Sequence, residues 1–298
     1  MKNCSIVLST FNRLAYLKKC LEALLAQDFS EYEIVIVNDG STDDTKEFLD
    51  SLSDPKIKII HHKKNLGLSV ARNTGIKNTY YDIIAFTDDD CLPEKNWLSQ
   101  LVAGFDSENV GLVIGQVFYI DKNYKGYFPE RLVQNIKAHW PMGANVAYHK
   151  KVFDTCGYFD PQFFKYNNED SEMAIRTVSY GFDFKKQPTA VVCHQADNWT
   201  TRSLLKSAHN GSVWPILKKK YPKDYLIFKP PIKFGLFVNY VEYFHILIFP
   251  IIIPILFIRY LAHGKRDLKI FFTKWPIYLL LKRFYIYEEA IKNKILML

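Results

Sequence analysis

Three consecutive carboxylates, Asp88, Asp89 and Asp90, follow an apolar run at residues 83–86. Like charges this close repel one another, so the run costs stability unless cations or hydrogen-bond donors compensate it. Hard carboxylate oxygens suit Mg²⁺ or Mn²⁺, and Mg²⁺ typically keeps other positions for water and phosphate oxygens. The run therefore indicates a divalent-cation site that also meets a phosphate group, with a solvated acidic turn as the alternative.

Three further carboxylates lie at positions of interest. Asp39 follows an apolar run at residues 34–37 and could accept hydrogen bonds from a nucleobase or a ribose, or could cap the turn that follows it. Glu169 and Asp170 begin an expected helix near residues 170–180, where negative charge stabilises the helix N-terminus.

The elements that must position these side chains are short β-rich runs that alternate with helical patterns. Five runs are the expected strands, at residues 5–9, 33–38, 57–61, 82–87 and 110–120. Helical spacing or a capping signal predicts helices at residues 14–25, 45–52 and 96–105. The alternation predicts a doubly wound α/β sheet, mostly parallel, with helices on both faces. Such a sheet binds ligands beyond the carboxyl ends of its strands, so the polar residues there are expected at one edge.

Six sequence strings stand in an order that is typical of one enzyme family. They are S-T-F-N-R at 9–13, V-N-D-G-S-T-D at 37–43, N-L-G-L-S-V-A-R-N-T-G at 65–75, F-T-D-D-D-C-L-P at 86–93, G-A-N-V-A at 143–147 and N-E-D-S-E-M-A-I-R at 168–176. By these strings, which cover about residues 5–185, the chain resembles glycosyltransferase family 2, with the GT-A fold. The resemblance implies an inverting, metal-dependent enzyme that uses a nucleotide sugar.

The resemblance implies a nucleotide-sugar site at the ends of the first strands. Its expected members are Thr10, Phe11, Asn12, Arg13, Asp39, Arg72, Asp88 and Asp89. Thr10 and Phe11 would line the base pocket, and Asp39 would bind uracil or its equivalent. Arg72 would approach the nucleotide.

The resemblance also implies the residues of the metal site. Asp88 and Asp90 would form the D-x-D pair, with Asp90 the direct ligand of Mg²⁺ or Mn²⁺. Because the middle residue, Asp89, is also an aspartate, which two of the three carboxylates bind metal stays open. His194 follows an apolar run and could reach the metal, as a late histidine does in some GT-A enzymes. A satisfied core or loop histidine is the alternative.

The catalytic and acceptor-binding residues are expected in the second half of the resemblance. Asp170 would act as the base of an inverting transfer, with Glu169 beside it. The turn formed by Gly143, Ala144 and Asn145 would contact the acceptor, within a loosely patterned stretch at residues 121–200.

The basic character of the chain lies in its last third. Residues 1–200 carry 22 Lys and Arg against 26 Asp and Glu, whereas residues 201–298 carry 17 against 5. A cationic segment rich in aromatic and Ile residues fits an anionic membrane surface better than a nucleic acid. We therefore expect a GT-A domain at residues 1–215, with a nucleotide-binding half at 1–120 and an acceptor-side half at 121–215. A helical, membrane-associated extension would follow at 216–298.

Residues 234–258 are about long enough to span a bilayer, but polar residues and prolines interrupt them. Basic clusters flank the segment on both sides, so both ends stay on one side if positive charges remain cytoplasmic. We expect an in-plane or re-entrant attachment, joined by residues 270–281, with a helical oligomer interface as the alternative. The five cysteines include no C-x-x-C pair, and no secretory leader is visible. The expected location is therefore cytoplasmic, peripheral or monotopic on the inner face of the cell membrane.

These expectations together predict the transfer of a sugar from a nucleotide sugar, first of all a UDP-sugar, to a hydroxyl. The acceptor would be a glycan or a lipid-linked molecule in the synthesis of a surface polysaccharide or glycolipid. A sugar-1-phosphate nucleotidyltransferase is one alternative, but it needs a glycine-rich loop where residues 9–13 hold no glycine. A non-catalytic, membrane-associated carbohydrate-binding or scaffold protein that has kept the fold is the other.

Overall fold

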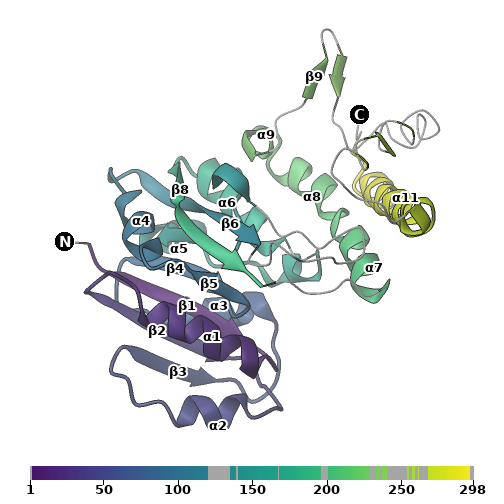
Figure 1. Cartoon of the computed structure of the whole chain (residues 1–298). Helices are drawn as coiled ribbons and strands as arrows, with labels where there is room; N and C mark the ends of the chain where they lie inside the picture. Colours follow the sequence, from purple (N-terminus) through teal and green to yellow (C-terminus); the bar gives the residue numbers. More distant parts are fainter. Residues whose placement is uncertain are drawn as a thin grey trace. The chain divides into compact units, whose positions relative to one another are not determined.

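The computed structural model divides the chain into two compact units (Figure 1). It describes residues 2–119, 135–138, 140–166, 168–195, 201–228, 232–234, 237–239, 254, 257–258, 261 and 268–295. The first unit comprises Met1–Lys122, Val133–Phe164 and Glu169–Gln195, and the second comprises Asn123–Leu132, Lys165–Asn168 and Ala196–Leu298. The first unit contains every residue that the sequence predicts for the site.

An eight-stranded mixed sheet forms the centre of the first unit, in the order β3-β2-β1-β4-β7-β6-β8-β5. The strands are β1 Cys4–Thr10, β2 Tyr32–Asn38, β3 Ile57–His61, β4 Ile83–Asp88, β5 Cys91–Pro93, β6 Val110–Tyr119, β7 Val146–His149 and β8 Asp183–His194. Strands β1 to β4 run parallel to one another, as β6 and β8 do. Strand β7 is antiparallel to β4 and β6, and β5 is antiparallel to β8. This confirms the expected α/β class with a mostly parallel sheet.

Helices cover both faces of the sheet. The helices of the first unit are α1 Leu14–Leu25, α2 Thr45–Asp50, α3 Leu68–Lys77, α4 Trp97–Ala103, α5 Lys150–Cys156 and α6 Glu169–Ser179. Successive residues of a strand point to opposite faces. On β1, Ile6 and Leu8 join one core cluster with Leu17 of α1, whereas Val7 lies against Gly75 of α3. Burial on both faces explains why these strands are continuous apolar runs.

The register of the parallel strands brings their polar ends together. Thr10 of β1 pairs with Asn38 of β2, and Ser9 pairs with Asp88 of β4. The backbone N–H of Asp39 donates to the carbonyl of Thr10 at 2.9 Å. The three strand ends that the sequence predicts at one edge therefore meet there.

Gly40 forms the turn that follows β2, and its backbone has a φ of +73°. A Cβ at this position would also overlap the carbonyl carbon of Lys64. We expect Gly40→Ala to lower the free energy of unfolding by about 3 kcal/mol or more, because strain in the left-handed region adds to that overlap. Gly181 is the matched control, since it has a φ of +88° but no heavy atom within 4 Å of its virtual Cβ. Urea unfolding should show that Gly181→Ala lowers the free energy of unfolding by only about 1 kcal/mol. Equal losses in Gly40→Ala and Gly181→Ala would contradict the predicted overlap of a Cβ at position 40 with Lys64.

The described part of the second unit is mainly helical. Its elements are α7 Thr201–Asn210, α8 Val213–Lys220, α9 Tyr225–Phe228, β9 Ile232–Phe234, β10 Phe237–Asn239 and α11 Leu268–Lys292. Helices α7 and α8 pack against α11, where the His209 and Tyr285 rings lie 5.0 Å apart. The expected boundary at residue 215 falls inside α8, close to its N-terminal end, and stays a prediction.

The expected membrane segment at residues 234–258 lies mostly outside the described residues. Residues 270–281, which are expected to join the membrane attachment, lie within helix α11. Among the helices that the structure describes, none combines the length and the apolar character needed to cross a bilayer.

Candidate active site

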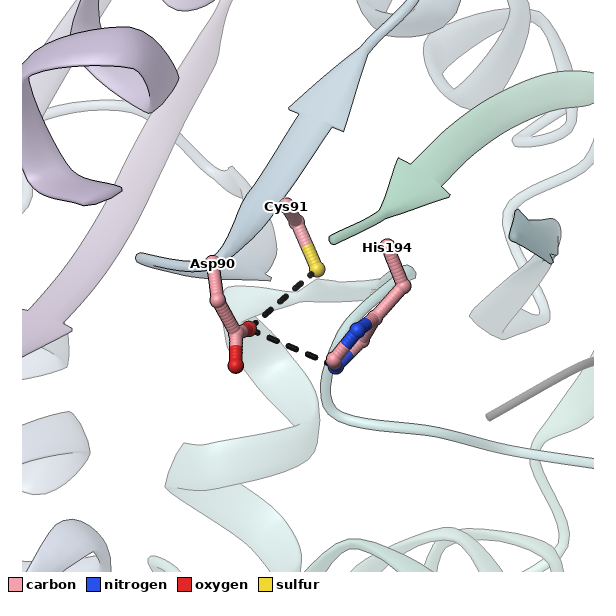
Figure 2. Close-up of side chains that lie close together, drawn as sticks. All are labelled: Asp90, Cys91 and His194. Atoms are coloured by element: carbon pink, nitrogen blue, oxygen red, sulfur yellow. Dashed lines mark hydrogen bonds and ion pairs between the residues drawn. The ribbon is translucent and has the colours of Figure 1, made fainter. Parts of the chain in front are cut away.

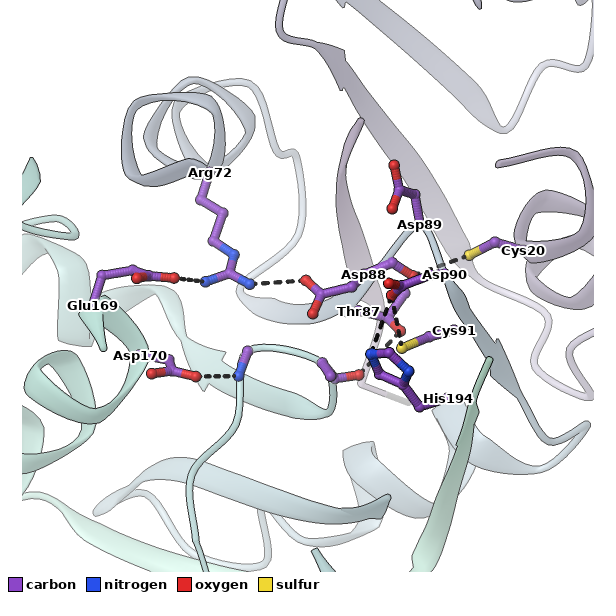
Figure 3. Close-up of polar contacts among 12 residues, drawn as sticks. Cys20, Arg72, Thr87, Asp88, Asp89, Asp90, Cys91, Glu169, Asp170 and His194 are labelled. Atoms are coloured by element: carbon purple, nitrogen blue, oxygen red, sulfur yellow. Dashed lines mark hydrogen bonds and ion pairs between the residues drawn. The ribbon is translucent and has the colours of Figure 1, made fainter. Parts of the chain in front are cut away.

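The three consecutive aspartates lie where β4 ends and the chain turns into β5, and their side chains have different partners (Figure 3). Asp88 contacts Arg72, Asp89 contacts the segment after β1, and Asp90 lies beside His194. Figure 3 shows the Asp89 carboxylate pointing away from Arg72 and His194. The Asp88 side chain is 31% exposed, whereas those of Asp89 and Asp90 are largely buried. The run therefore divides into carboxylates with separate roles.

Asp89 is held by the connection between β1 and α1. Its Oδ2 accepts a hydrogen bond of 2.8 Å from Thr10 Oγ1, and its Oδ1 lies 3.1 Å from Arg13 Nη1. Burial raises the pKa of Asp89 to about 6, although the Arg13 charge opposes the shift. These contacts fix the loop that follows β1, and the expected contact of Asp89 with the nucleotide sugar stays a prediction.

Asp90, Cys91 and His194 form a compact cluster (Figure 2). Cys91 pairs with His194 where β5 meets β8, and one ligand atom from each of the three residues lies within 4.8 Å of the others. Asp90 Oδ1 is 3.4 Å from His194 Nε2. His194 Nδ1 lies 2.7 Å from the carbonyl of Gln195, which can only accept, so Nδ1 donates to it and Nε2 is the ring nitrogen that faces Asp90.

The cluster fits an oxygen-preferring divalent cation through its carboxylate and imidazole. Burial raises the pKa of the Cys91 thiol well above its ordinary value, so Cys91 stays protonated and can donate to Asp90. Metals bind thiolates rather than thiols. Among the three residues, Asp90 and His194 are thus suited to hold Mg²⁺ or Mn²⁺. Asp88, the last residue of β4, lies two residues before Asp90 and is a further candidate ligand. Their role as ligands remains a prediction.

Arg72 connects the aspartate run to the pair that begins α6 (Figure 3). Its Nη2 lies 3.0 Å from Asp88 Oδ1, and its Nη1 lies 2.8 Å from Glu169 Oε1. The guanidinium passes so close to Gly143 that a Cβ there would overlap it. Arg72 is buried, so the surrounding protein fixes the orientation of its guanidinium between Asp88 and Glu169. The expected approach of Arg72 to the nucleotide stays a prediction.

Glu169 is a buried carboxylate with only one of its oxygens paired. Its Oε2 has no hydrogen-bond partner among the residues that the structure describes, and burial raises the pKa of Glu169 to about 7 against the opposing charge of Arg72. A raised native pKa means that the folded state binds more protons than the unfolded state between about pH 4.5 and about pH 7. Stability must then fall as the pH rises through this range.

We expect Glu169→Gln to remove the part of the pH-dependent fall in unfolding free energy that comes from the carboxyl group of Glu169. The check is the difference in urea unfolding free energy between wild type and variant, measured from pH 4.5 to pH 8. Glu47→Gln on the exposed surface of α2 is the control and should leave the curve parallel to that of the wild type. Parallel curves for Glu169→Gln would show that Glu169 has an ordinary pKa.

Asp170 presents a carboxylate that backbone donors align. Its Oδ2 accepts from the N–H of Gly143 at 2.8 Å, and its Oδ1 accepts from the N–H of Ser171 at 2.6 Å. Burial raises the pKa of Asp170 above its ordinary value, opposed by the Arg72 charge and by these two donors. Unlike Glu169, Asp170 is partly exposed. A partly exposed, aligned carboxylate is suited to receive a proton from a bound hydroxyl.

Asp39 fastens the end of β2 to the loop before α3. It accepts hydrogen bonds from the N–H groups of Leu66 at 2.9 Å and Gly67 at 2.8 Å. His62 Nδ1 donates to the same carboxylate at 2.7 Å. Phe11, next to Thr10, is 40% exposed and offers apolar surface for a planar base.

The sequence analysis does not foresee the loop residues that hold Asp39. His62 directly follows β3, and this strand-end position is the signal that could have identified it. Leu66 and Gly67 lie just before α3 and belong to the string at residues 65–75, which is the signal that could have identified them.

Asn12 and Arg13 have contacts within the protein. Asn12 has a φ of +53°, and its Oδ1 accepts from the N–H of Thr42 at 2.7 Å, which ties the loop after β1 to the loop after β2. Arg13 Nη1 contacts Asp90 Oδ2 at 2.8 Å and also Asp89. The Arg13 side chain remains 40% exposed, so it can also meet a ligand at this edge.

The expected acceptor turn needs one correction. Asn145 is fully buried, and its Oδ1 accepts from Trp97 Nε1 at 2.8 Å. Its Nδ2 donates to the carbonyls of Gln116 and Ala190. The side chain of Asn145 is therefore used to join the strands and is not available to an acceptor. Gly143 and Ala144 act through their backbone, as the Gly143 contact to Asp170 and the Ala144 carbonyl contact to Thr87 show.

The family model described as "Glycosyl transferase family 2" matches residues 5–172. Glycosyltransferase AglE of Haloferax volcanii is 27% identical over 204 residues, which cover 64% of this chain and 66% of that protein. Hyaluronan synthase of Pasteurella multocida is 25% identical over 265 residues, which cover 74% of this chain and 27% of that protein. The chain thus spans less than two thirds of the length of these relatives.

Two solved structures share the fold. The mannosyltransferase PcManGT from Pyrobaculum calidifontis, solved with GDP-Man and Mn²⁺, matches with a TM-score of 0.61 at 16% identity, over 98% of this chain and 87% of that one. S. aureus TarS 1–349, solved with UDP-GlcNAc, matches with a TM-score of 0.57 at 19% identity, over 73% of this chain and 66% of that one. This likeness confirms the expected GT-A-like α/β fold. Because the family model matches more than half of its residues, the chain belongs to glycosyl transferase family 2.

Proposed function

We propose that this protein transfers a sugar, with inversion, from a nucleotide sugar to a hydroxyl acceptor. The observation that carries the proposal is the chain of contacts from Asp88 through Arg72 to Glu169, the neighbour of Asp170. It links a cluster suited to a cation with a carboxylate suited to act as base. An enzyme that joins two substrates needs both groups near the reacting atoms.

The proposed chemistry divides between these two groups. An acceptor hydroxyl loses its proton as its oxygen attacks the anomeric carbon, and Asp170 is placed to receive that proton. The bond between the anomeric carbon and the diphosphate breaks on the opposite face of the sugar. Asp90 and His194, with Asp88, would hold the cation, which neutralises charge on the departing diphosphate when bound.

The proposed donor is a UDP-sugar, bound at the end of β1 and β2. Asp39 Oδ2 accepts only the Gly67 N–H among the described contacts, so it can accept one more hydrogen bond from a base. The structural neighbours were solved with UDP-GlcNAc and with GDP-Man. Both nucleotides therefore belong in the test. The hyaluronan synthase relative supports a glycan as the acceptor class.

The test follows nucleoside diphosphate release from a panel of UDP-, GDP- and other sugar nucleotides. Each donor is incubated with the purified protein and with glycan or lipid-phosphate acceptors, with and without a chelator. We expect release with at least one donor, and its loss on chelation. Donor binding without turnover would favour the scaffold alternative. Pyrophosphate release from a nucleoside triphosphate and a sugar-1-phosphate would favour the nucleotidyltransferase.

We also propose that the second unit binds an anionic membrane surface. The exposed large apolar residues of α11 are Leu268, Phe272, Ile277, Leu280, Phe284 and Ile291. Residues 201–298 carry 17 Lys and Arg against 5 Asp and Glu, which complements acidic lipid headgroups.

We expect the paired change Phe272→Ser with Phe284→Ser to weaken binding to phosphatidylglycerol vesicles by about 10-fold or more, because two aromatic side chains lose their apolar contact. Co-sedimentation measures the effect. Tyr80→Ser is the control, since Tyr80 is 81% exposed on the first unit and should leave binding unchanged. Failure of the wild type to bind these vesicles, or equal binding by the paired variant, would contradict the proposal.

A further inference from the structure

Trp140 lies on the segment between Ile136–Ala138 and β7, and its indole reaches the start of α6. Its Nε1 donates a hydrogen bond of 3.1 Å to Ser171 Oγ. Ser171 Oγ lies 3.3 Å from Asp170 Oδ1. Ser171, the middle member of this polar chain, is only 1% exposed. The expected roles derived from the sequence use neither Trp140 nor Ser171.

The direction of these hydrogen bonds follows from the chemistry of the three groups. An indole N–H can only donate, so the Ser171 oxygen must accept from Trp140. The hydroxyl then keeps its own proton for Asp170, whose ionised carboxylate can only accept. The relay therefore runs one way, from Trp140 through Ser171 to Asp170 Oδ1.

The segment Trp140–Gly143 controls both oxygens of the Asp170 carboxylate. It holds Oδ1 through Ser171, and the N–H of Gly143 donates directly to Oδ2 at 2.8 Å. A carboxylate bound at both oxygens cannot rotate without breaking a contact. The plane of the carboxylate is thus set by this segment as well as by α6.

Asn135 anchors the same segment to the sheet. Its Oδ1 accepts from the backbone N–H of Trp140 at 2.9 Å, and its Nδ2 donates to the Trp140 carbonyl. The backbone of Asn135 bridges to Val117 of β6. Trp140 is therefore held at its backbone and at its indole, which makes it a fixed point from which the relay starts.

We infer that Trp140 and Ser171 are positioning residues that orient Asp170 toward the acceptor hydroxyl. The inference rests on the proposed function, in which Asp170 is the base. Proton transfer depends on alignment, and a displacement of about 1 Å can cost about 100-fold in rate. Loss of one hydrogen bond in the relay is expected to cost less, about 10-fold.

The test uses two single variants and their combination. Trp140→Phe keeps an aromatic ring but removes the N–H, and Ser171→Ala removes the hydroxyl. Each should lower kcat about 10-fold and leave the KM for the donor within about 2-fold. Because both act through one relay, the double variant should be no slower than the slower single variant. Ser179→Ala is the control, since that hydroxyl on the same helix donates to the carbonyl of Arg176 and has no contact with Asp170 in the described part of the chain.

The outcomes separate the relay from a merely structural role and from the proposed function. Wild-type kcat in both single variants would overturn the inference, as would rate losses that multiply in the double variant. A rise in the donor KM with unchanged kcat would also overturn it. Thermal unfolding of each variant identifies any loss that comes from misfolding, and Ser171→Ala still decides the matter if Trp140→Phe does not fold. If the wild type releases no nucleotide from any donor, the proposed function has failed instead.

Discussion

Asp170→Asn should lower turnover by at least about 100-fold and leave donor affinity within about 2-fold. General base catalysis contributes about 10²–10⁴ in rate, and an amide cannot accept the hydroxyl proton. The change keeps the size of the side chain, although its NH₂ group must face one of the two N–H donors that align the carboxylate. Nucleotide release measures turnover, and titration calorimetry with the donor measures affinity.

Asp154→Asn is the control for this experiment. Asp154 is exposed on α5, and its replacement should leave both turnover and donor affinity unchanged. Normal turnover in Asp170→Asn would remove Asp170 from the role of base. A parallel loss of donor affinity would instead indicate that the change disturbs the Arg72 and Glu169 contacts next to it.

Asp90→Asn should weaken Mn²⁺ binding by at least about 10- to 100-fold and abolish metal-stimulated turnover. Asp90 Oδ1 faces His194 Nε2 at 3.4 Å, so the variant removes the negative charge from the candidate site. Changes to residues that merely orient metal ligands already cost about 10–100-fold in affinity, and loss of a ligand charge should cost no less. Electron paramagnetic resonance of Mn²⁺ reports binding without a need for turnover.

The neighbouring residue provides a demanding control. Asp89→Asn removes a charge one residue away, but the Asp89 carboxylate contacts Thr10 and Arg13. We expect it to leave Mn²⁺ affinity within about 3-fold, because the hydrogen bonds of Asp89 go to Thr10 and Arg13 rather than to the candidate site. If Asp89→Asn weakens Mn²⁺ binding as much as Asp90→Asn does, the division of roles within the run is wrong.

The sequence predicts the strands that are buried on both faces better than the others. Strands β1, β2, β4 and β6 appear as dense apolar runs, because parallel strands covered by helices need no polar face. Strand β8 escapes prediction because Lys185 and Lys186 interrupt it and Pro188 lies where its register against β6 shifts. Strand β7 has only four residues, too few to show a period.

Helix α3 also escapes prediction as an element. It carries Arg72 and contains Asn73, Thr74 and Gly75, which have low helix propensity. Its helical form depends on packing against the sheet, where Gly75 allows close approach to Val7. In the sequence, this segment is identified only by the string at residues 65–75 that carries the family resemblance.

The location of the site follows from the sequence, but the partner of each side chain does not. Parallel strands end at one edge, so Thr10, Asp39 and Asp88 could be placed together from the strand pattern alone. The alternation that turns Asp89 away from Asp88 and Asp90 depends on the path of the chain after β4. Contacts across long stretches of sequence, such as Trp140 with Ser171, leave no periodic signal.

The ion-pair chain through Arg72 also limits how such an enzyme can be recombined. Asp88 and Arg72 come from the first 120 residues, whereas Gly143 and Glu169 come from a later stretch. A hybrid that joins the first stretch to the second half of another family member must receive a glycine at position 143 and a carboxylate at position 169. Any larger residue at 143 would push Arg72 from Asp88, and a neutral residue at 169 would leave a buried guanidinium short of a partner. Segments exchanged between relatives to alter acceptor specificity must therefore leave positions 143 and 169 unchanged.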